Sequence, residues 1–170
     1  MERYDGPIQG RTSDREPDLQ ETETRRRIRA LLDEQPFAVL CTQGGGRPYG
    51  SVIAYAVGPQ LCAITFATPT ATHKYRLLCE CESVALVVDS RSSFPGEIMK
   101  VEAITATGHA VQLDPGPEFD RWANLLTQRH PQLHSFVHAP SSALFRIDIA
   151  RYKHVSRFQE VRRWTPMPNG

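Results

Sequence analysis

Residues 37–66 constrain the fold most, because they hold three short β-rich runs separated by turn residues. The runs cover 37–41, 47–57 and 61–66, and the turns between them contain Gly44-Gly45-Gly46 and Gly58-Pro59. Glycine-rich loops between β-rich runs are typical of antiparallel hairpins. No helix with a Lys-Ser or Lys-Thr pair follows the triple glycine, so a nucleotide-binding phosphate loop is not supported.

The remaining pattern alternates further strands with a few helices. Later strands are expected at 84–88, 98–113 and 142–155, with a last one at 158–164, and helices at 18–34, 71–81 and 117–130. Gly108 inside the 98–113 run predicts a bulge or a close backbone approach. About six strands in hairpin order predict a mainly β fold, an antiparallel barrel with helices across its openings.

Length and composition favour one domain of ordinary type. The chain has 170 residues and a formal net charge of +1. We expect a flexible leader over 1–17, rich in polar residues, and a single domain over 18–165. No secretory leader or bilayer-length apolar run is readable, and four cysteines in no metal or redox spacing are expected to be free thiols. The sequence therefore predicts a cytoplasmic protein without a membrane partner.

A basic cluster at Arg25-Arg26-Arg27-Ile28-Arg29 leaves two interpretations open. It could contact phosphates of a nucleic acid, or it could be a solvated helix face balanced by Glu21 and Glu23. The near-zero net charge and the absence of a nucleic-acid fold signature favour the second. We therefore expect no nucleic-acid partner.

The stretch Phe66-Ala-Thr-Pro-Thr-Ala-Thr-His-Lys-Tyr75 places two basic side chains where a helix should begin. A helix N-terminus carries partial positive charge, so His73 and Lys74 would repel it. With Thr70 as N-cap, the amide groups of Thr72 and His73 would be free, and the collection would suit a phosphate. The alternative is that Lys74 and Arg76 only extend into water.

Three segments in order resemble the FMN-binding split β-barrel family, which includes pyridoxamine 5′-phosphate oxidase. They are Arg47-Pro-Tyr-Gly-Ser51, the 66–75 stretch, and Val84-Ala-Leu-Val-Val-Asp-Ser-Arg91. Ile104-Thr-Ala-Thr-Gly-His-Ala110 also fits a Thr-x-x-Gly pattern of that family. The resemblance covers about residues 25–155 and implies a split β-barrel.

The resemblance implies a homodimer with two FMN sites at the subunit interface. Lys74 would be the main phosphate cation, with His73, Thr68 and Thr72 beside it. The second strand would line the flavin ring, Phe66 and Ala67 would follow at the ring or ribityl chain, and Asp89 with Arg91 could reach the ribityl chain or phosphate. The strand residues concerned are Arg47, Tyr49, Gly50, Ser51 and Val52. The resemblance also implies the function that we expect, an FMN-dependent oxidoreductase acting on an unassigned small molecule.

The resemblance does not extend to every feature. The tail Arg157-Phe-Gln-Glu-Val-Arg-Arg-Trp164 does not match the arginine-rich substrate signature of pyridoxamine 5′-phosphate oxidase. Relatives on this barrel that bind haem or a deazaflavin, or that only sense a flavin, remain alternatives. No catalytic residue is assigned, and His130, His134 and His138, which Pro131 interrupts, do not predict a metal site.

Overall fold

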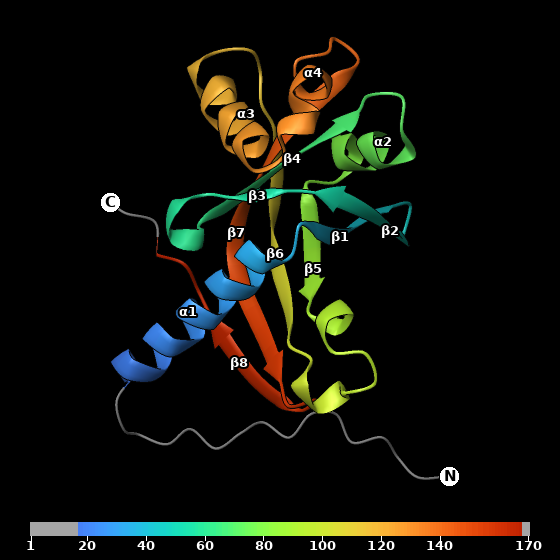
Figure 1. Cartoon of the computed structure of the whole chain (residues 1–170). Coiled ribbons are helices and arrows are strands. Elements are labelled where there is room, and N and C mark those ends of the chain that lie inside the picture. The colour runs from blue at the N-terminus through green and yellow to red at the C-terminus, as the bar shows by residue number, and fades with distance from the viewer. Residues whose placement is uncertain (1–16, 168–170) are drawn as a thin grey trace.

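The computed structural model describes residues 17–167 of the chain (Figure 1). The expected leader at 1–17 therefore lies outside the described residues except for Pro17, which begins the first helix. The helices are α1 (Pro17–Glu34), α2 (His73–Glu80), α3 (Pro117–Arg129) and α4 (His134–Val137). The strands are β1 (Phe37–Gly44), β2 (Arg47–Ala54), β3 (Ala56–Val57), β4 (Ala63–Pro69), β5 (Ser83–Asp89), β6 (Ala103–Gln112), β7 (Ser142–Ser156) and β8 (Glu160–Trp164).

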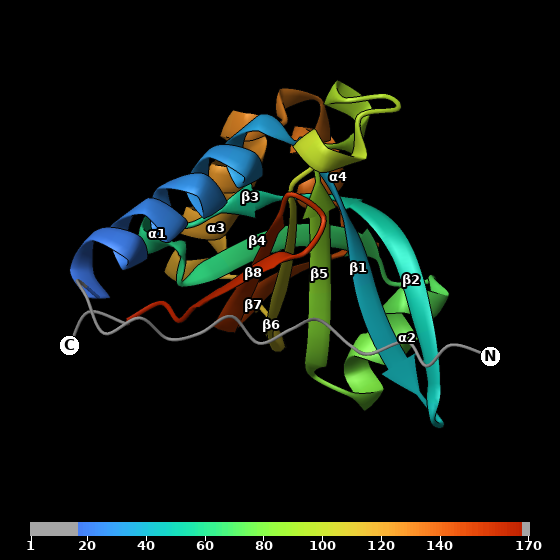
Figure 2. The same ribbon diagram turned by 90° about the horizontal axis from the view of Figure 1, so that it is seen from below.

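All strands belong to one antiparallel sheet that curls into a split barrel (Figure 2). The strand order is β2-β1-β5-β6-β7-β4-β3, and β8 pairs with β7 beside this path. The sheet therefore has eight strands rather than the expected six. The 47–57 run breaks at Tyr55 into β2 and β3, and the short last run expected at 158–164 adds β8 to the six longer ones.

The first hairpin follows from its glycines. Gly45 and Gly46 have φ angles of 56° and 74°, a left-handed backbone that side chains with a Cβ rarely adopt. Two such residues match the twist of the flanking strands, so β1 and β2 pair along their whole length from Gly44–Arg47 to Phe37–Ala54. The hairpin predicted from residues 37–57 is confirmed.

Gly108 marks a shift of register between β6 and β7. A Cβ built at this position would lie 2.1 Å from the carbonyl oxygen of Asp148, so only glycine allows the two backbones to come this close. The predicted bulge and close approach are confirmed. The strand itself begins at Ala103, because residues 98–100 form a 3-10 turn instead of extending it.

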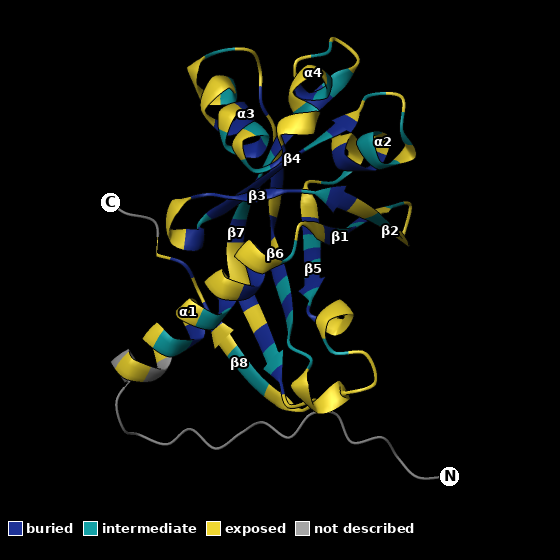
Figure 3. Ribbon diagram, in the orientation of Figure 1, coloured by how far each residue is buried: buried dark blue, intermediate teal, exposed yellow. Residues whose placement is uncertain are grey.

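The core fills the inside of the curled sheet. Ile28, Leu31 and Leu32 of α1 are buried against it, as the apolar stripe of that helix predicted. A second buried cluster forms under α3, around Trp122 and Leu126. Figure 3 shows buried segments along the strands of the sheet, whereas much of α1 and α3 is exposed.

Two further findings concern the surroundings of the chain. Within residues 17–167, no helix is both long and apolar enough to cross a bilayer. All four cysteines are free, as expected.

Candidate functional site

The start of α2 is the first part of the candidate site. Thr72, not Thr70, is the N-cap: its hydroxyl accepts a hydrogen bond from the Tyr75 amide at 3.2 Å. The expected helix at 71–81 is accordingly shorter, covering His73–Glu80. Thr70 is used differently, because its amide and hydroxyl both donate to the carbonyl of Ser141, directly before β7. This tie fixes the turn that leads into the helix.

Two backbone amides at this helix start lack an acceptor. The Thr72 amide donates to the Pro69 carbonyl at 3.3 Å, so it is not free as expected. Among the described residues, nothing accepts a hydrogen bond from the amides of His73 or Lys74. Free amides at a helix N-terminus, together with the helix dipole, favour an anion.

Lys74 adds a cation to these amides. Its side chain is half-buried, and this desolvation lowers the pKa of its amine. No carboxylate among the side chains that the structure describes lies within 4.0 Å of it. A partly desolvated cation without a counter-ion is unfavourable, and a bound anion would relieve it.

The β2 strand contributes one of its two faces to this region. Arg47, Tyr49 and Ser51 lie on the inner face of β2. Tyr49 and Ser51 pair with the buried residues Thr42 and Leu40 of β1, and paired residues of neighbouring strands point to the same face of the sheet. The Tyr49 ring meets the His73 ring edge-on, with 4.9 Å between centroids. Figures 1 and 2 both show α2 against the β1–β2 hairpin.

Ser51 supplies a third group without a partner. Its hydroxyl oxygen is buried and has no hydrogen-bond partner within the described part of the chain. Leaving such a group unpaired costs about 1–3 kcal/mol, so a ligand that hydrogen-bonds to it would be favoured. Ser51 lies on the same strand face as Tyr49, which touches α2. Free amides, an unpaired cation and an orphan hydroxyl suit a phosphate-bearing polar ligand.

The β4 residues behind the turn are buried. Thr68 is fully buried and shares a 3.2 Å hydrogen bond with the Thr72 hydroxyl, so it supports the cap. Phe66 lies in the core and stacks on Phe145 at 5.5 Å, so only its backbone faces away from the core. Ala67 is half-buried. These residues shape the turn more than they present side chains to a ligand.

Three of the other site residues proposed from the sequence, Gly50, Val52 and Asp89, lie on the outer face of the sheet, and Arg91 lies in the 3-10 turn after β5. Gly50 and Val52 point away from α2, since they alternate with Tyr49 and Ser51. Val52, Asp89 and Arg91 line one cavity of about 340 Å³. There the Asp89 carboxylate accepts from the Arg91 amide and pairs with its guanidinium at 3.3 Å. The proposed residues thus form two groups in this chain, an α2 group and an outer group.

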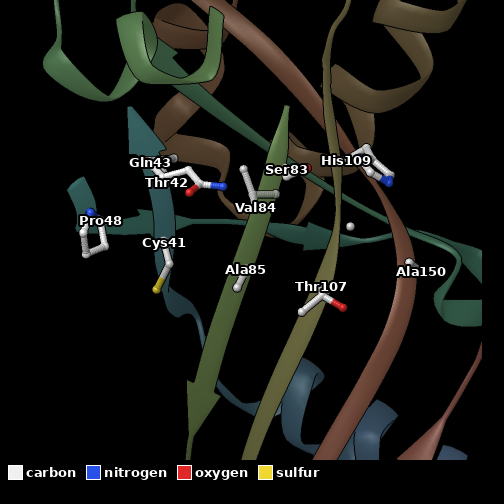
Figure 4. Close-up of a pocket in the computed structure, with 11 residues that line it drawn as sticks. Cys41, Thr42, Gln43, Pro48, Ser83, Val84, Ala85, Thr107, His109 and Ala150 are labelled. Carbon is white, nitrogen blue, oxygen red and sulfur yellow. The ribbon is translucent and has the colours of Figure 1, made fainter. Parts of the chain in front are cut away.

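A second hollow on the outer face was not anticipated from the sequence. It has a volume of about 460 Å³ and includes Cys41, Gln43, Thr107 and His109 on β1 and β6 (Figure 4). His109 lies 3.7 Å from Glu82 at its rim. Strand alternation places these four side chains on one face of the sheet. They are far apart in the sequence, so the hollow could not be predicted from it.

The remaining sequence features have simpler explanations. In the α1 cluster, Arg26 and Arg27 pair with Glu23, and Arg29 pairs with Asp33. His130 is buried against the Tyr55 carbonyl, while the rings of His134 and His138 stack at 4.6 Å. In residues 17–167, no group of three His, Cys, Asp or Glu side chains is arranged to hold a metal.

Solved structures with the same fold bind different cofactors. A haem-binding protein from Mycobacterium smegmatis has a TM-score of 0.73 at 15% identity, over 88% of this chain and 59% of that one. An FAD-binding protein from Mesorhizobium loti has a TM-score of 0.61 at 15% identity, over 81% and 92% of the two chains. At these identities the likeness shows the fold alone.

A third structure carries a family name. It is a Clostridium acetobutylicum protein related to general stress protein 26 of the pyridoxinephosphate oxidase family, with a TM-score of 0.64 at 12% identity, over 84% of this chain and 94% of that one. No curated protein sequence matches the chain significantly. The sequence profile described as pyridoxamine 5′-phosphate oxidase, however, matches residues 24–156, close to the 25–155 expected from the resemblance. The match covers most of the chain, which therefore belongs to the pyridoxamine 5′-phosphate oxidase family.

Proposed function

We propose that this protein binds FMN and acts as an FMN-dependent oxidoreductase on a small molecule. The observation that carries the proposal is the half-buried Lys74, which has no carboxylate partner among the described residues and stands beside two free amides. Membership of the family and an FAD-binding structural neighbour support a flavin.

The residues around α2 would hold the phosphate. Lys74 Nζ and the amides of His73 and Lys74 would donate to its oxygens, and the Thr68–Thr72 pair would keep the turn in place. Charge-assisted hydrogen bonds of this kind are about twice as strong as neutral ones. Ser51, with its unsatisfied hydroxyl, would hydrogen-bond to a polar group of the same ligand. Bound FMN would supply the redox chemistry, while the chain binds and orients it.

The outer residue group would serve the partner's site in a homodimer. Val39, Val52 and Val87 form an apolar row across β1, β2 and β5, with Val52 exposed and the others half-buried. A row of this kind on an open sheet face suits a second copy of the chain. Asp89 and Arg91 at its end would then approach the flavin that the partner holds by α2. This arrangement would unite two groups that a single protomer keeps apart.

The first test is cofactor identity. We expect the purified protein to show flavin absorption and to release FMN, identified by mass. Titration of the cofactor-free protein should give much tighter binding of FMN than of riboflavin, which lacks the phosphate. Equal affinity for both would contradict the phosphate site. Anaerobic reduction of bound FMN by NADH or NADPH would then test the oxidoreductase part, and a flavin that no donor reduces would favour a sensing protein.

Haem binding is the second candidate, because the Mycobacterium smegmatis neighbour binds haem on the same fold. A Soret band in place of flavin absorption would establish it, and a deazaflavin would be distinguished by its mass. The helix start suits the phosphate of FMN, and the propionates of haem are anions too, so the absorption spectrum and the mass of the released cofactor decide between them.

The homodimer has its own test. Val52→Glu places a charge in the apolar row and should give a monomer by sedimentation that also binds FMN weakly. Arg47→Glu, on the opposite face of the same strand, should leave the dimer intact. A dimeric V52E protein would show that this face is not the interface.

A further inference from the structure

A third cavity lies between helices α3 and α4 and the strand ends beneath them. It has a volume of about 370 Å³, within the range of about 300–1,000 Å³ that is usual for small-molecule sites. Figure 1 shows α3 and α4 beside each other at one end of the sheet, and both helices contact β7. This α3–α4 cavity shares no lining residue with the α2 group or the outer group, so it is separate from the proposed FMN site.

The floor of the α3–α4 cavity is apolar. Leu113, Val137 and Leu144 are buried side chains of the second core cluster, and Phe119 of α3 packs against that cluster. The His138 ring of α4 meets the Phe119 ring edge-on, with 6.0 Å between centroids, and both rings line the cavity. Such a floor favours an aromatic or branched apolar body in a ligand.

The rim of the cavity carries negative charge. Asp114 and Asp120 line it, and both are exposed. Neither forms an ion pair among the residues that the structure describes, and no lining residue is a lysine or an arginine. The positive end of the α3 dipole does not invite an anion either, because the carboxylates of Glu118 and Asp120 already lie in its first turn. The rim therefore favours a cation.

Ser142 adds a hydrogen-bonding group at a greater depth than the rim. Its Oγ atom is buried and has no partner within the described part of the chain. Pro69, which faces Ser142 across the β4–β7 pair, has no N–H to offer. A buried hydroxyl without a partner is unfavourable, and it can either donate to a ligand or accept from one. The cavity thus has two polar positions, an exposed anionic one and a buried neutral one, and an apolar floor.

We propose that the α3–α4 cavity binds a small aromatic amine that carries a second polar group. The ammonium group would lie at the rim with Asp114 and Asp120, the apolar body on the floor, and the second polar group at the Ser142 hydroxyl. An ammonium has three donors and no acceptor, so it complements the two carboxylates. This ligand site goes beyond the proposed flavin chemistry and does not depend on it, because no residue belongs to both sites.

Tyramine is a probe with all three features, and three related molecules each change one end of it. Phenylethylamine lacks the phenol hydroxyl, tyrosol has an alcohol in place of the ammonium group, and 3-(4-hydroxyphenyl)propionate has a carboxylate there. Ligand-detected NMR at pH 7, where an alkylamine is a cation, gives the Kd of each. We expect about 1 mM or below for tyramine and roughly two- to tenfold weaker binding of phenylethylamine and tyrosol. The propionate should not bind detectably.

Two variants connect these differences to named residues. Asp114→Asn combined with Asp120→Asn should weaken tyramine binding roughly two- to tenfold and leave tyrosol binding unchanged. Glu21→Gln is the matched control, since Glu21 is an exposed carboxylate of α1 that does not line the cavity. Ser142→Ala should weaken tyramine binding by a similar factor and leave phenylethylamine binding unchanged.

Ser142→Ala has a second readout that does not involve a ligand. Because the substitution removes a buried hydroxyl without a partner, the free S142A protein should be as stable to urea as the wild type, or more stable. A clear loss of stability would reveal a partner for this hydroxyl and overturn its role in binding. No saturable binding of tyramine up to about 10 mM, or equal affinity for tyramine and the propionate, would overturn the site itself. Unchanged tyramine affinity in both variants would place the probe elsewhere on the protein and overturn the proposal too.

Discussion

Helices α1 and α2 both carry clustered basic residues, but they use them in opposite ways. In α1, Arg26 and Arg27 form hydrogen-bonded ion pairs with Glu23 at 2.9 Å, and Arg27 also reaches Glu102 at 3.0 Å. In α2, Lys74 is half-buried, and no carboxylate of the described chain pairs with it. The number of basic residues therefore says little about ligand binding. A cation that the fold partly buries and leaves unpaired is the informative feature.

The largest expected difference between the helices is in FMN affinity. Lys74→Met removes a charged donor to the phosphate and should weaken FMN binding about 10- to 100-fold, since hydrogen bonds to charged groups contribute about 1.5–3 kcal/mol. Arg26→Met in α1 is the matched control and should leave affinity unchanged. Fluorescence titration with FMN measures both. An equal loss of FMN affinity in K74M and R26M would show that the basic residues of α2 are no more important for FMN binding than those of α1.

The cap of α2 should have a clear but smaller effect on stability. Thr72→Ala removes the hydroxyl that accepts from the Tyr75 amide and bonds to Thr68, and should cost about 1 kcal/mol in the free energy of unfolding. Thr72→Ser keeps the oxygen and should restore most of this. Urea unfolding gives the values. If T72A has the same free energy of unfolding as the wild type, this hydroxyl does not hold the helix start. The cap would then not be what orients the free amides of His73 and Lys74.

Removing a cation should also affect stability differently in the two helices. Arg27→Met leaves the partly buried Glu102 and the Glu23 carboxylate without this partner, so we expect a loss of up to about 1 kcal/mol. Lys74→Met removes a partly desolvated charge that has no partner, so the cofactor-free protein should be as stable as the wild type or more stable. Urea unfolding without FMN tests both. A larger loss for K74M would reveal a counter-ion for Lys74.

The sequence predicted the fold well because its signals are local. The Gly45-Gly46 turn, the bulge at Gly108 and the apolar stripe of α1 each depend on backbone conformation or on periodicity within one segment. The start of α2 was placed two residues early, since Thr70 and Thr72 are both good caps. Only the contact of Thr70 with Ser141, in the turn before β7, decides between them.

The candidate site was less predictable, because it depends on faces and partners. The segment 47–52 was expected to act as a unit, but strand alternation directs Tyr49 and Ser51 toward α2 and Val52 to the outer face. The missing counter-ion of Lys74 cannot be deduced from sequence, as acidic residues distant in the chain could have reached it. Glu102, which is 75 residues away from Arg27, does this for α1.

The smallest expected effect concerns acid and belongs to α1. Hydrogen bonds from Arg26 and Arg27 lower the pKa of Glu23 from 4.5 to about 2. A carboxylate with a lowered pKa in the folded state stabilises the protein above pH 4.5, and this contribution disappears as pH falls from about 4.5 to about 2. Glu23→Gln should therefore lose less stability than the wild type over this window, as measured by urea unfolding at several pH values. Because Glu23 lies at the surface, salt should reduce the difference. If E23Q and the wild type lose stability equally over this pH window, the ion pairs of α1 contribute nothing measurable to the free energy of unfolding. The two helices would then differ only in ligand binding.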